Sequence, residues 1–343
     1  MKFFSFFTQE LAIDLGTANT LIMCDGKVVV DEPSIVAKDR RTNETIAVGH
    51  KAMQMHGKTH ENIKTVRPLR DGVIADFQAA EDMIAGLINM VGNRRRFFSH
   101  LKMVICIPSG ITEVEKRAVF DSADHVDSKE TYLIYEPMAA ALGIGLEVEE
   151  PVGNVIIDIG GGTTEIAVIA LSGIVNDQSI RTAGDEFTAD IVDYMKRAHN
   201  ILIGERTAEQ IKINVGSALH ELENPPPDYA VNGRDLMTGI PKQITISYNE
   251  VAQAIDKSIS KVEEAVMKAL ESTPPELAAD IYKTGLYLTG GGALLRGLDK
   301  RLSQKTKLPV HIAEDPLRAV VRGTGIALKN THRFSFLIDR KSV

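Results

Sequence analysis

The stretch that decides the fold is residues 155–164, Val-Ile-Ile-Asp-Ile-Gly-Gly-Gly-Thr-Thr. An apolar run ends in a carboxylate, three glycines and two threonines follow, and a second β-prone run begins at Glu165. This pattern predicts a strand, a tight turn and a returning strand. Because glycine has no Cβ atom, the backbone N–H groups of such a turn can approach an anionic ligand closely. Taken alone, the stretch also fits an ordinary glycine-rich hairpin.

The chain repeats this pattern near its N-terminus. Residues 11–20 read Leu-Ala-Ile-Asp-Leu-Gly-Thr-Ala-Asn-Thr, and in both copies a threonine follows the aspartate by six places. An internal repeat predicts two related halves that face each other. Two hairpins, each with an aspartate and polar turn atoms, could hold one polyphosphate and its cation from opposite sides.

A third glycine cluster, residues 290–292, follows a predicted strand and precedes a predicted helix. Such a turn is a general device for nucleotide binding, because a helix N-terminus and a closely approaching backbone both favour phosphate. The cluster matches neither the Walker A pattern nor the G-x-G-x-x-G spacing of dinucleotide-binding proteins.

Length and composition indicate a globular protein of two lobes. The chain has 343 residues, too many for one comfortable core, with 44% apolar and 25% charged residues. Its net charge of −7 argues against nucleic acid as a partner. Cys24 and Cys106 each lie in an apolar run, which is typical of buried thiols in a reducing compartment. His56 and His60 lack a helical pattern around them, which disfavours a zinc site.

Local signals place several polar residues on helices. Thr112 with Glu115, and Thr207 with Gln210, are each spaced as a capping box. Residues 132–135 form a predicted strand, and a helix of small residues follows with Pro137 in its first turn. Glu136, at the end of that strand, either faces the ligand or is an ordinary surface carboxylate. Glu209 and Lys212 share a helix face, either as a surface ion pair or as one edge of a base pocket.

Aromatic residues beside basic ones indicate contact with a membrane. Lys2 neighbours Phe3, Phe4, Phe6 and Phe7, and residues 94–96, all arginine, run into Phe97 and Phe98. Aromatics flanked by cations suit the headgroup region of an anionic bilayer. The alternative is that these rings pack on the first lobe. No apolar run is long enough to span a bilayer and no signal peptide is evident, so we expect a cytoplasmic protein.

Together the motifs resemble those of the actin, sugar-kinase and heat-shock-chaperone ATPase superfamily. The matching segments are residues 14–20 and 158–164 for phosphate, 135–145 for the connection and 288–294 for adenosine. The sequences of the motifs are most similar to those of the MreB family of bacterial actin-like cell-shape proteins, notably in residues 67–76, 107–112 and 202–209. The resemblance runs from about residue 10 to residue 330.

This resemblance implies a fold and a division of the chain. We expect a duplicated actin-like, ribonuclease H-like α/β fold, with two lobes and a nucleotide cleft between them. The implied segments are a membrane-contact segment at residues 1–10, a first lobe at 11–145 with an insertion at about 39–71, a second lobe at 146–330 with an insertion at about 182–243, and a tail at 331–343.

The resemblance also implies a site for ATP and Mg²⁺. Asp14 and Asp158 would hold the ion through water, and Glu136 with Thr163 would position the attacking water. The phosphates would be cradled by Thr17, Ala18, Asn19, Gly160, Gly161, Gly162 and Thr163. The adenosine would lie between Glu209, Gln210, Ile211 and Lys212 on one side and Gly290, Gly291, Gly292 and Ala293 on the other.

The implied function is that of a filament protein with slow ATP hydrolysis. Family members form double filaments of one protein on the inner face of the cytoplasmic membrane and organise cell-wall synthesis with membrane proteins of the elongation machinery. A sugar kinase or a chaperone-type ATPase of the same superfamily is the alternative. The first would need a sugar pocket with a catalytic aspartate, and the second would need a further substrate-binding domain.

Overall fold

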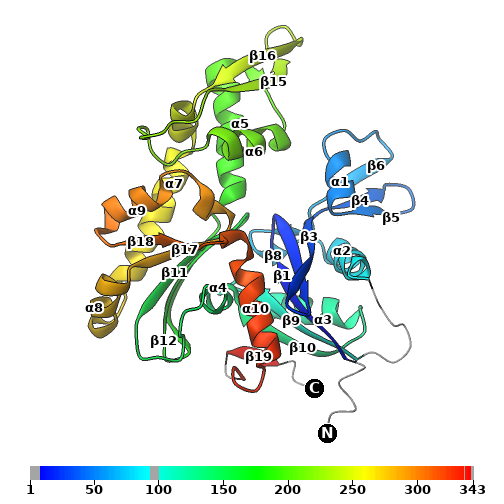
Figure 1. Cartoon of the computed structure of the whole chain (residues 1–343). Helices are drawn as coiled ribbons and strands as arrows, with labels where there is room; N and C mark the ends of the chain where they lie inside the picture. The colour runs from blue at the N-terminus through cyan, green and yellow to red at the C-terminus, as the bar shows by residue number, and fades with distance from the viewer. Residues whose placement is uncertain (1–7, 93–99, 336, 341–343) are drawn as a thin grey trace.

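Two large sheets organise the molecule, and each contains one of the two aspartate hairpins (Figure 1). The structure is a computed structural model that describes residues 8–92, 100–335 and 337–340. In the described part of the chain, no helix is both long enough and apolar enough to cross a membrane.

The first sheet has the strand order β19-β10-β9-β1-β2-β3. β1, β2 and β3 form an antiparallel meander, while β9 and β10 run parallel to β1, and β19 closes the edge antiparallel to β10. The bounds are β1 Thr8–Leu15, β2 Asn19–Cys24, β3 Lys27–Pro33, β9 His100–Ile107, β10 Ser128–Tyr135 and β19 Ile338–Arg340.

The second sheet repeats this arrangement in the order β13-β12-β11-β17-β18. Again three antiparallel strands come first, and two strands parallel to the first of them follow. The bounds are β11 Asn154–Ile159, β12 Thr164–Ala170, β13 Gly173–Ile180, β17 Leu286–Thr289 and β18 Val310–Ile312. The predicted duplicated α/β fold is therefore confirmed.

Smaller elements extend each lobe beyond its sheet (Figure 1). In the first lobe they are β4 Val36–Asp39, β5 Thr45–Val48, α1 His50–Met55, β6 Ile63–Val66, β7 Leu69–Arg70 and β8 Val73–Ile74. In the second lobe they are α5 Gly184–His199, β14 Ile201–Leu202, α6 Glu205–Val215, β15 Tyr229–Asp235 and β16 Pro241–Ile246.

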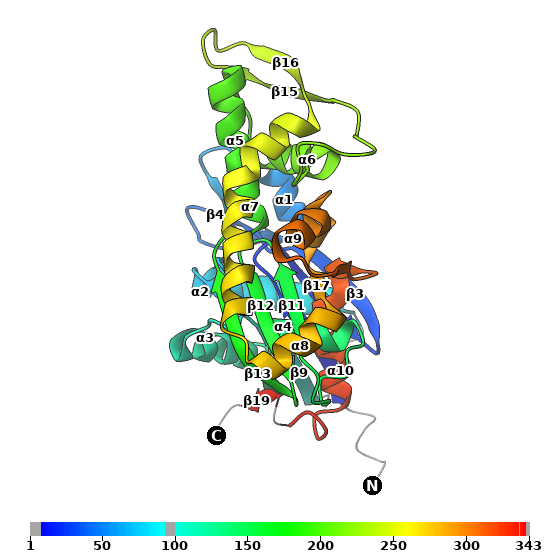
Figure 2. The same ribbon diagram turned by 90° about the vertical axis from the view of Figure 1, so that its left-hand side faces the viewer.

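The remaining helices cover the sheets. Those of the first lobe are α2 Phe77–Met90 and α3 Glu113–Asp124, and those of the second are α7 Tyr248–Glu271, α8 Pro275–Thr284, η2 Gly291–Leu294, α9 Leu298–Thr306 and η3 Pro316–Arg318. Figure 2 shows α7 running along the length of the second lobe. The apolar side of α7 is buried in the core of that lobe, with Val251, Ile255, Ile259, Val262 and Val266 inside.

Two further helices lie between the sheets (Figure 1). α4 Glu136–Gly143 and α10 Ala319–Lys329 share one core cluster that takes side chains from both sheets. The sequence placed α10 at the end of the second lobe, yet this helix packs on β1 and β9 of the first sheet. The backbones cross closely, because a Cβ atom on Gly143 or Gly323 would overlap a carbonyl oxygen of the other helix.

The predicted helix caps have opposite outcomes. Thr112 and Glu115 form the reciprocal capping box at the start of α3, as predicted. The capping box predicted for Thr207 and Gln210 is wrong, since α6 begins at Glu205 after Gly204. The Thr207 N–H bonds to the Gly204 carbonyl oxygen, so Thr207 already lies inside the first turn. An acidic residue in that turn is favoured by the helix dipole.

The tail folds back onto the first lobe. β19 pairs with residues 132–134 of β10, and Phe334 is buried in the core cluster between the sheets. Arg333 pairs with Glu149 in the segment that joins the lobes, and Lys116 pairs with Asp339. The tail therefore covers a sheet edge that would otherwise offer unpaired backbone groups.

Candidate functional site

The two aspartate hairpins meet at their turns. A Cβ atom built on Gly161 would lie 2.6 Å from Ala18 Cβ, and one built on Gly162 would lie 2.6 Å from Thr17 Oγ1. Side chains at these two glycines would push the turns apart. A tertiary contact thus explains the glycines, because the first turn lies so close to the second that Gly161 and Gly162 have no room for a side chain.

Each turn is fixed by a segment from its own lobe. In the first turn, Ser34 Oγ donates to the Gly16 carbonyl at 2.6 Å, and the Ser34 N–H donates to the Ala18 carbonyl at 2.9 Å. In the second turn, the N–H groups of Gly184 and Asp185, at the start of α5, donate to the carbonyls of Gly160 and Gly161 at 3.1 Å and 2.7 Å. Both turns are therefore held by hydrogen bonds from their own lobes.

The carbonyl groups of the turns accept hydrogen bonds from the protein, whereas several N–H groups of the turns do not donate to it. Within the described residues, the backbone N–H groups of Thr17, Ala18, Gly161 and Gly162 donate to no protein acceptor. The side chain of Thr17 is only 7% exposed. Backbone donors in such positions are normally paired, and successive N–H groups at a turn form an anion-binding concavity. The arrangement suits a phosphate chain held from both lobes.

Two aspartates lie beside the turns, Asp158 buried and Asp14 partly buried. Asp14 accepts a hydrogen bond from Cys106 Sγ at 3.2 Å, and Asp158 accepts one from Thr289 Oγ1 at 2.8 Å. Burial raises the pKa of Asp14 to about 7, and the charge of Asp158 adds to that rise. Burial also raises the pKa of Asp158 to about 6. Two such carboxyl groups that repel each other form an environment that favours a cation.

Glu136 and Glu165 complete a group of four carboxyl groups. Glu136, the first residue of α4, is 9% exposed, and Glu165 in β12 is fully buried. Burial raises the pKa of Glu136 well above its usual value, and the charges of Glu165, Asp158 and Asp14 raise it further. Glu136 is therefore not the surface carboxylate of the alternative interpretation. Glu165 was predicted to lie in a strand and was given no role in the site, although a glutamate in a run of apolar residues is a signal of function.

The acidic group has no basic partner in the described part of the chain. Among the residues that the structure describes, no Lys, Arg or His nitrogen lies within 4.0 Å of these four carboxylates. No three His, Cys, Asp or Glu side chains of the described chain are close enough to chelate a metal directly. The donor set therefore fits an ion held through its water shell. Mg²⁺ fits this description, since it usually keeps several waters.

The predicted adenosine residues do not all lie at the turns. Lys212 Nζ lies 2.7 Å from the Gly184 carbonyl and 2.8 Å from Glu209, so both side chains approach the N-terminus of α5 beside the second turn. Ile211, in contrast, is fully buried in the core of the second lobe, and Gln210 is exposed. We correct the prediction for the Ile211 side chain, because helical periodicity turns it away from the face shared by Glu209 and Lys212.

The third glycine cluster lies against the end of β11. Gly290 has a φ of 77°, and a Cβ atom there would lie 2.8 Å from Asp158 Oδ1 and would overlap the Ile159 carbonyl oxygen. Gly292 would meet the Ile159 side chain, and Ala293 is buried. The cluster opens a helix as predicted, which is the short 3-10 helix η2, and the α-helix α9 begins only at Leu298. It brings bare backbone next to Asp158.

Two further contacts across the lobes were not predicted. Arg67, after β6, has one guanidinium nitrogen 3.6 Å from Asp185 and another 3.6 Å from Glu205. Asp71 and Gly72 lie over the second turn, where a Cβ atom on Gly72 would lie 2.9 Å from Thr163 Cγ2. The Gly72 N–H donates to Thr17 Oγ1 at 3.0 Å. Nothing local in the sequence marks these long-range contacts.

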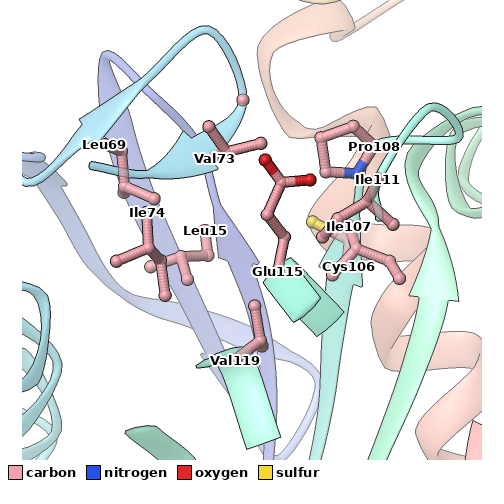
Figure 3. A pocket seen from close by; sticks show the side chains of 11 residues that line it. Leu15, Leu69, Val73, Ile74, Cys106, Ile107, Pro108, Ile111, Glu115 and Val119 are labelled. Carbon is pink, nitrogen blue, oxygen red and sulfur yellow. The ribbon is translucent and has the colours of Figure 1, made fainter. Parts of the chain in front are cut away.

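A small cavity lies behind the first turn and is not the candidate site. It has a volume of about 10 Å³, room for about one water molecule. Figure 3 shows Glu115 pointing toward Val73 and Pro108 at its rim, with Leu15 and Val119 among the apolar side chains that line it. A nucleotide is far larger than this space.

The predicted membrane residues cannot be placed. Phe3, Phe4, Phe6, Phe7, Phe97 and Phe98 lie outside the described residues. Contact with a membrane therefore stays a prediction.

Two duplicated α/β lobes that meet at paired glycine-rich hairpins define an actin-like protein. Structures of the same fold include the MamK double helical filament, with a TM-score of 0.77 at 20% identity over 95% of this chain and 99% of that one. The chain belongs to the MreB/Mbl protein family, whose model matches residues 8–335.

Close relatives cover almost the whole chain. The cell shape-determining protein Mbl of Bacillus subtilis is 46% identical over 325 residues, 94% of this chain and 97% of the relative. The cell shape-determining protein MreB of Escherichia coli K12 is 47% identical over 338 residues, 96% of this chain and 95% of the relative. The crystal structure of MreB5 of Spiroplasma citri bound to ADP has a TM-score of 0.90 at 40% identity, covering 95% of this chain and 98% of that one. The same protein bound to AMPPNP gives a TM-score of 0.88.

Proposed function

We propose that this protein binds ATP with Mg²⁺ between the two hairpin turns, hydrolyses it slowly, and polymerises into filaments on the inner face of the cytoplasmic membrane. These filaments would direct cell shape and cell-wall synthesis in rod-shaped bacteria. The observation that carries the nucleotide site is the pair of touching turns. Among the described residues, their N–H groups donate to no protein acceptor, and the neighbouring carboxylates have no basic partner within 4.0 Å.

The roles of the residues follow from their positions. The N–H groups of Thr17, Ala18, Gly161 and Gly162 would hold phosphate oxygens. Asp14 and Asp158 would hold the Mg²⁺ water shell, and the ion would neutralise charge on the phosphates. Its charge would also return both aspartates to their ionised forms, against the effect of burial.

Hydrolysis would depend on two residues from different lobes. Glu136 belongs to α4, which follows β10 of the first sheet. Thr163 lies in the turn between β11 and β12 of the second sheet. A water molecule between them would be oriented by the Thr163 hydroxyl and the Glu136 carboxyl group. Phosphoryl transfer depends mainly on positioning and electrostatics, so slow turnover needs no further catalytic group.

Filament formation and membrane contact rest on the family and on the sequence. The named relatives are cell shape-determining proteins, and a MamK structure of the same fold is a double helical filament. Aromatic and basic residues outside the described part of the chain suit an anionic bilayer. Weak contacts of single copies would add up in a polymer. Membrane proteins of cell-wall elongation are the expected partners.

The test combines binding, turnover and sedimentation. Glu136→Ala should bind ATP within about threefold of the unmodified protein but release phosphate about a hundredfold more slowly, since a water-positioning carboxylate contributes about this much. Glu130→Ala, which removes an exposed carboxylate from the same region, is the control and should change neither value. The unmodified protein should sediment with anionic liposomes in the presence of Mg²⁺ and ATP.

Several results would contradict the proposal. Unchanged phosphate release by Glu136→Ala would remove Glu136 from its role. Phosphorylation of added sugars without sedimentation would favour a sugar kinase instead. A protein that neither binds ATP nor sediments would refute the nucleotide site and the filament together.

A further inference from the structure

Glu165 is a buried carboxylate that has no role in the ATP binding and hydrolysis proposed above. It is fully buried and lies directly opposite Asp158 in the register of β11 and β12. It follows Thr163 by two residues, so it lies at the base of the second turn. Burial raises its pKa, as expected for a carboxyl group that exchanges water for the protein interior.

Three hydrogen bonds hold this carboxylate, and they come from both lobes. Ser109 donates its Oγ at 2.6 Å and its N–H at 3.1 Å to one oxygen, Oε2. Ser179, in the neighbouring strand β13, donates its Oγ at 2.7 Å to the other oxygen, Oε1. Ser179 belongs to the same sheet as Glu165, whereas Ser109 belongs to the loop that leaves β9 in the first sheet.

The loop of Ser109 lies close against the second lobe. A Cβ atom built on Gly110 would lie 3.1 Å from Ser179 Cβ. The strand that precedes this loop, β9, carries Cys106, which donates to Asp14. The loop that bonds to Glu165 thus follows the strand that bonds to Asp14, and Glu165 itself pairs with Asp158 in the register of β11 and β12.

An unneeded buried charge at this position would be costly. A buried carboxylate without hydrogen bonds strongly destabilises a fold, and an apolar side chain would pack equally well in the strand. In the described chain Glu165 has no basic partner within 4.0 Å, only hydroxyl and N–H donors. Two of these three donors cross between the lobes, which points to a role in fixing one lobe to the other.

We propose that Glu165 is a positioning residue for hydrolysis, and that its bonds to Ser109 fix the distance between Glu136 of the first lobe and Thr163 of the second. This inference rests on the proposed ATP hydrolysis. The connection is short, because Thr163 precedes Glu165 on one strand, and Ser109 follows the strand that pairs with β10, from which Glu136 begins α4. The hydrogen bonds between Ser109 and Glu165 thus link the two lobes next to the pair of residues, Glu136 and Thr163, that would position the water.

The two serines form a matched pair of variants. Ser109→Ala and Ser179→Ala each remove one hydroxyl bond to the same carboxylate, but only the first bond joins the lobes. We expect Ser109→Ala to lower kcat for phosphate release about tenfold, since a displacement of about 1 Å can cost about a hundredfold. Its Kd for ATP should stay within twofold. Ser179→Ala should retain nearly full kcat, and Ser109→Thr, which keeps the hydroxyl, should restore it.

The outcomes separate this inference from the proposed function. If Ser109→Ala hydrolyses ATP at the normal rate, or if both alanine variants lose the same fraction of kcat, Glu165 is only a structural residue and the inference is wrong. If the unmodified protein does not hydrolyse ATP, the proposed function fails. In that case, backbone hydrogen exchange still tests whether the bonds between Ser109 and Glu165 link the lobes. Exchange of the Ser109 and Gly110 amides should rise in Ser109→Ala and not in Ser179→Ala, and equal exchange in both variants would refute the inference.

Discussion

Asp14 and Asp158 show how a residue acquires its chemistry from its surroundings. Each is the penultimate residue of the first, apolar strand of a hairpin, and this position makes Asp158 buried and Asp14 partly buried. Thr289 and Cys106 donate single hydrogen bonds to them, which offset only part of the cost of burial. The residues are therefore poised to bind a cation, and in its absence burial raises the pKa of both carboxyl groups.

This environment predicts a pH dependence of the nucleotide-free protein. The folded pKa values, about 7 for Asp14 and about 6 for Asp158, lie above the usual value of 3.8. The folded state therefore binds protons more tightly than the unfolded state, and the free energy of unfolding falls as the pH rises from 3.8 toward 7. Thermal melting between about pH 5.5 and 7.5 should show Tm decreasing with pH, and less so with Mg²⁺ and ATP.

Asp14→Asn is the control for this prediction, because it removes the titrating group that has the higher pKa. Its Tm should vary less over the same range. A Tm of the unmodified protein that increases across this range would contradict the burial of the two carboxylates.

At the scale of elements, the crossing of α4 and α10 holds the two sheets together. Both helices are built of small residues at the contact, and their shared core cluster takes side chains from each sheet. A Cβ atom on Gly323 would overlap the carbonyl oxygen of Ala139 and lie 2.8 Å from the Gly143 N atom. Backbone atoms cannot yield as a side chain can, so this crossing tolerates no added methyl group.

Gly323→Ala should therefore destabilise the protein by about 3 kcal/mol or more, through overpacking against backbone. Gly325→Ala is the matched control two residues along the same helix. A Cβ atom there would lie 2.6 Å from Met23 Sδ, in a flexible side chain that can move. Urea unfolding of both variants measures the difference, and equal loss of stability would contradict the close crossing.

At the scale of the whole molecule, the proposed filament needs a membrane anchor that can be removed separately. Replacing Phe3, Phe4, Phe6 and Phe7 together with serine should abolish sedimentation with anionic liposomes, because the apolar area that would enter the bilayer is lost. ATP-dependent pelleting without lipid should continue. Val114→Ser, which changes an 80% exposed apolar side chain on α3, is the control. Full retention of liposome binding by the serine variant would show that the four rings pack on the protein.

The sequence predicted the local parts of this architecture because their causes are local. A strand that ends in Asp158 and turns through three glycines is specified by side-chain alternation and backbone freedom within about ten residues. The repeat at residues 11–20 extended this to two related halves. The Thr112 and Glu115 cap was predictable for the same reason. The start of α6 was not, because either Gly204 or Thr207 could take the N-cap position.

The tertiary structure decided what depends on segments distant in the sequence. The bond between Ser109 and Glu165 joins residues 56 apart, and the crossing of Gly143 and Gly323 joins two helices that are far apart in the sequence. The burial of Glu136 also depends on how the lobes pack. No local pattern encodes these contacts, because each forms only when chain closure places two independent elements together. The sequence alone determined the two hairpins and the family, and only the folded lobes determined which carboxylates share one interior.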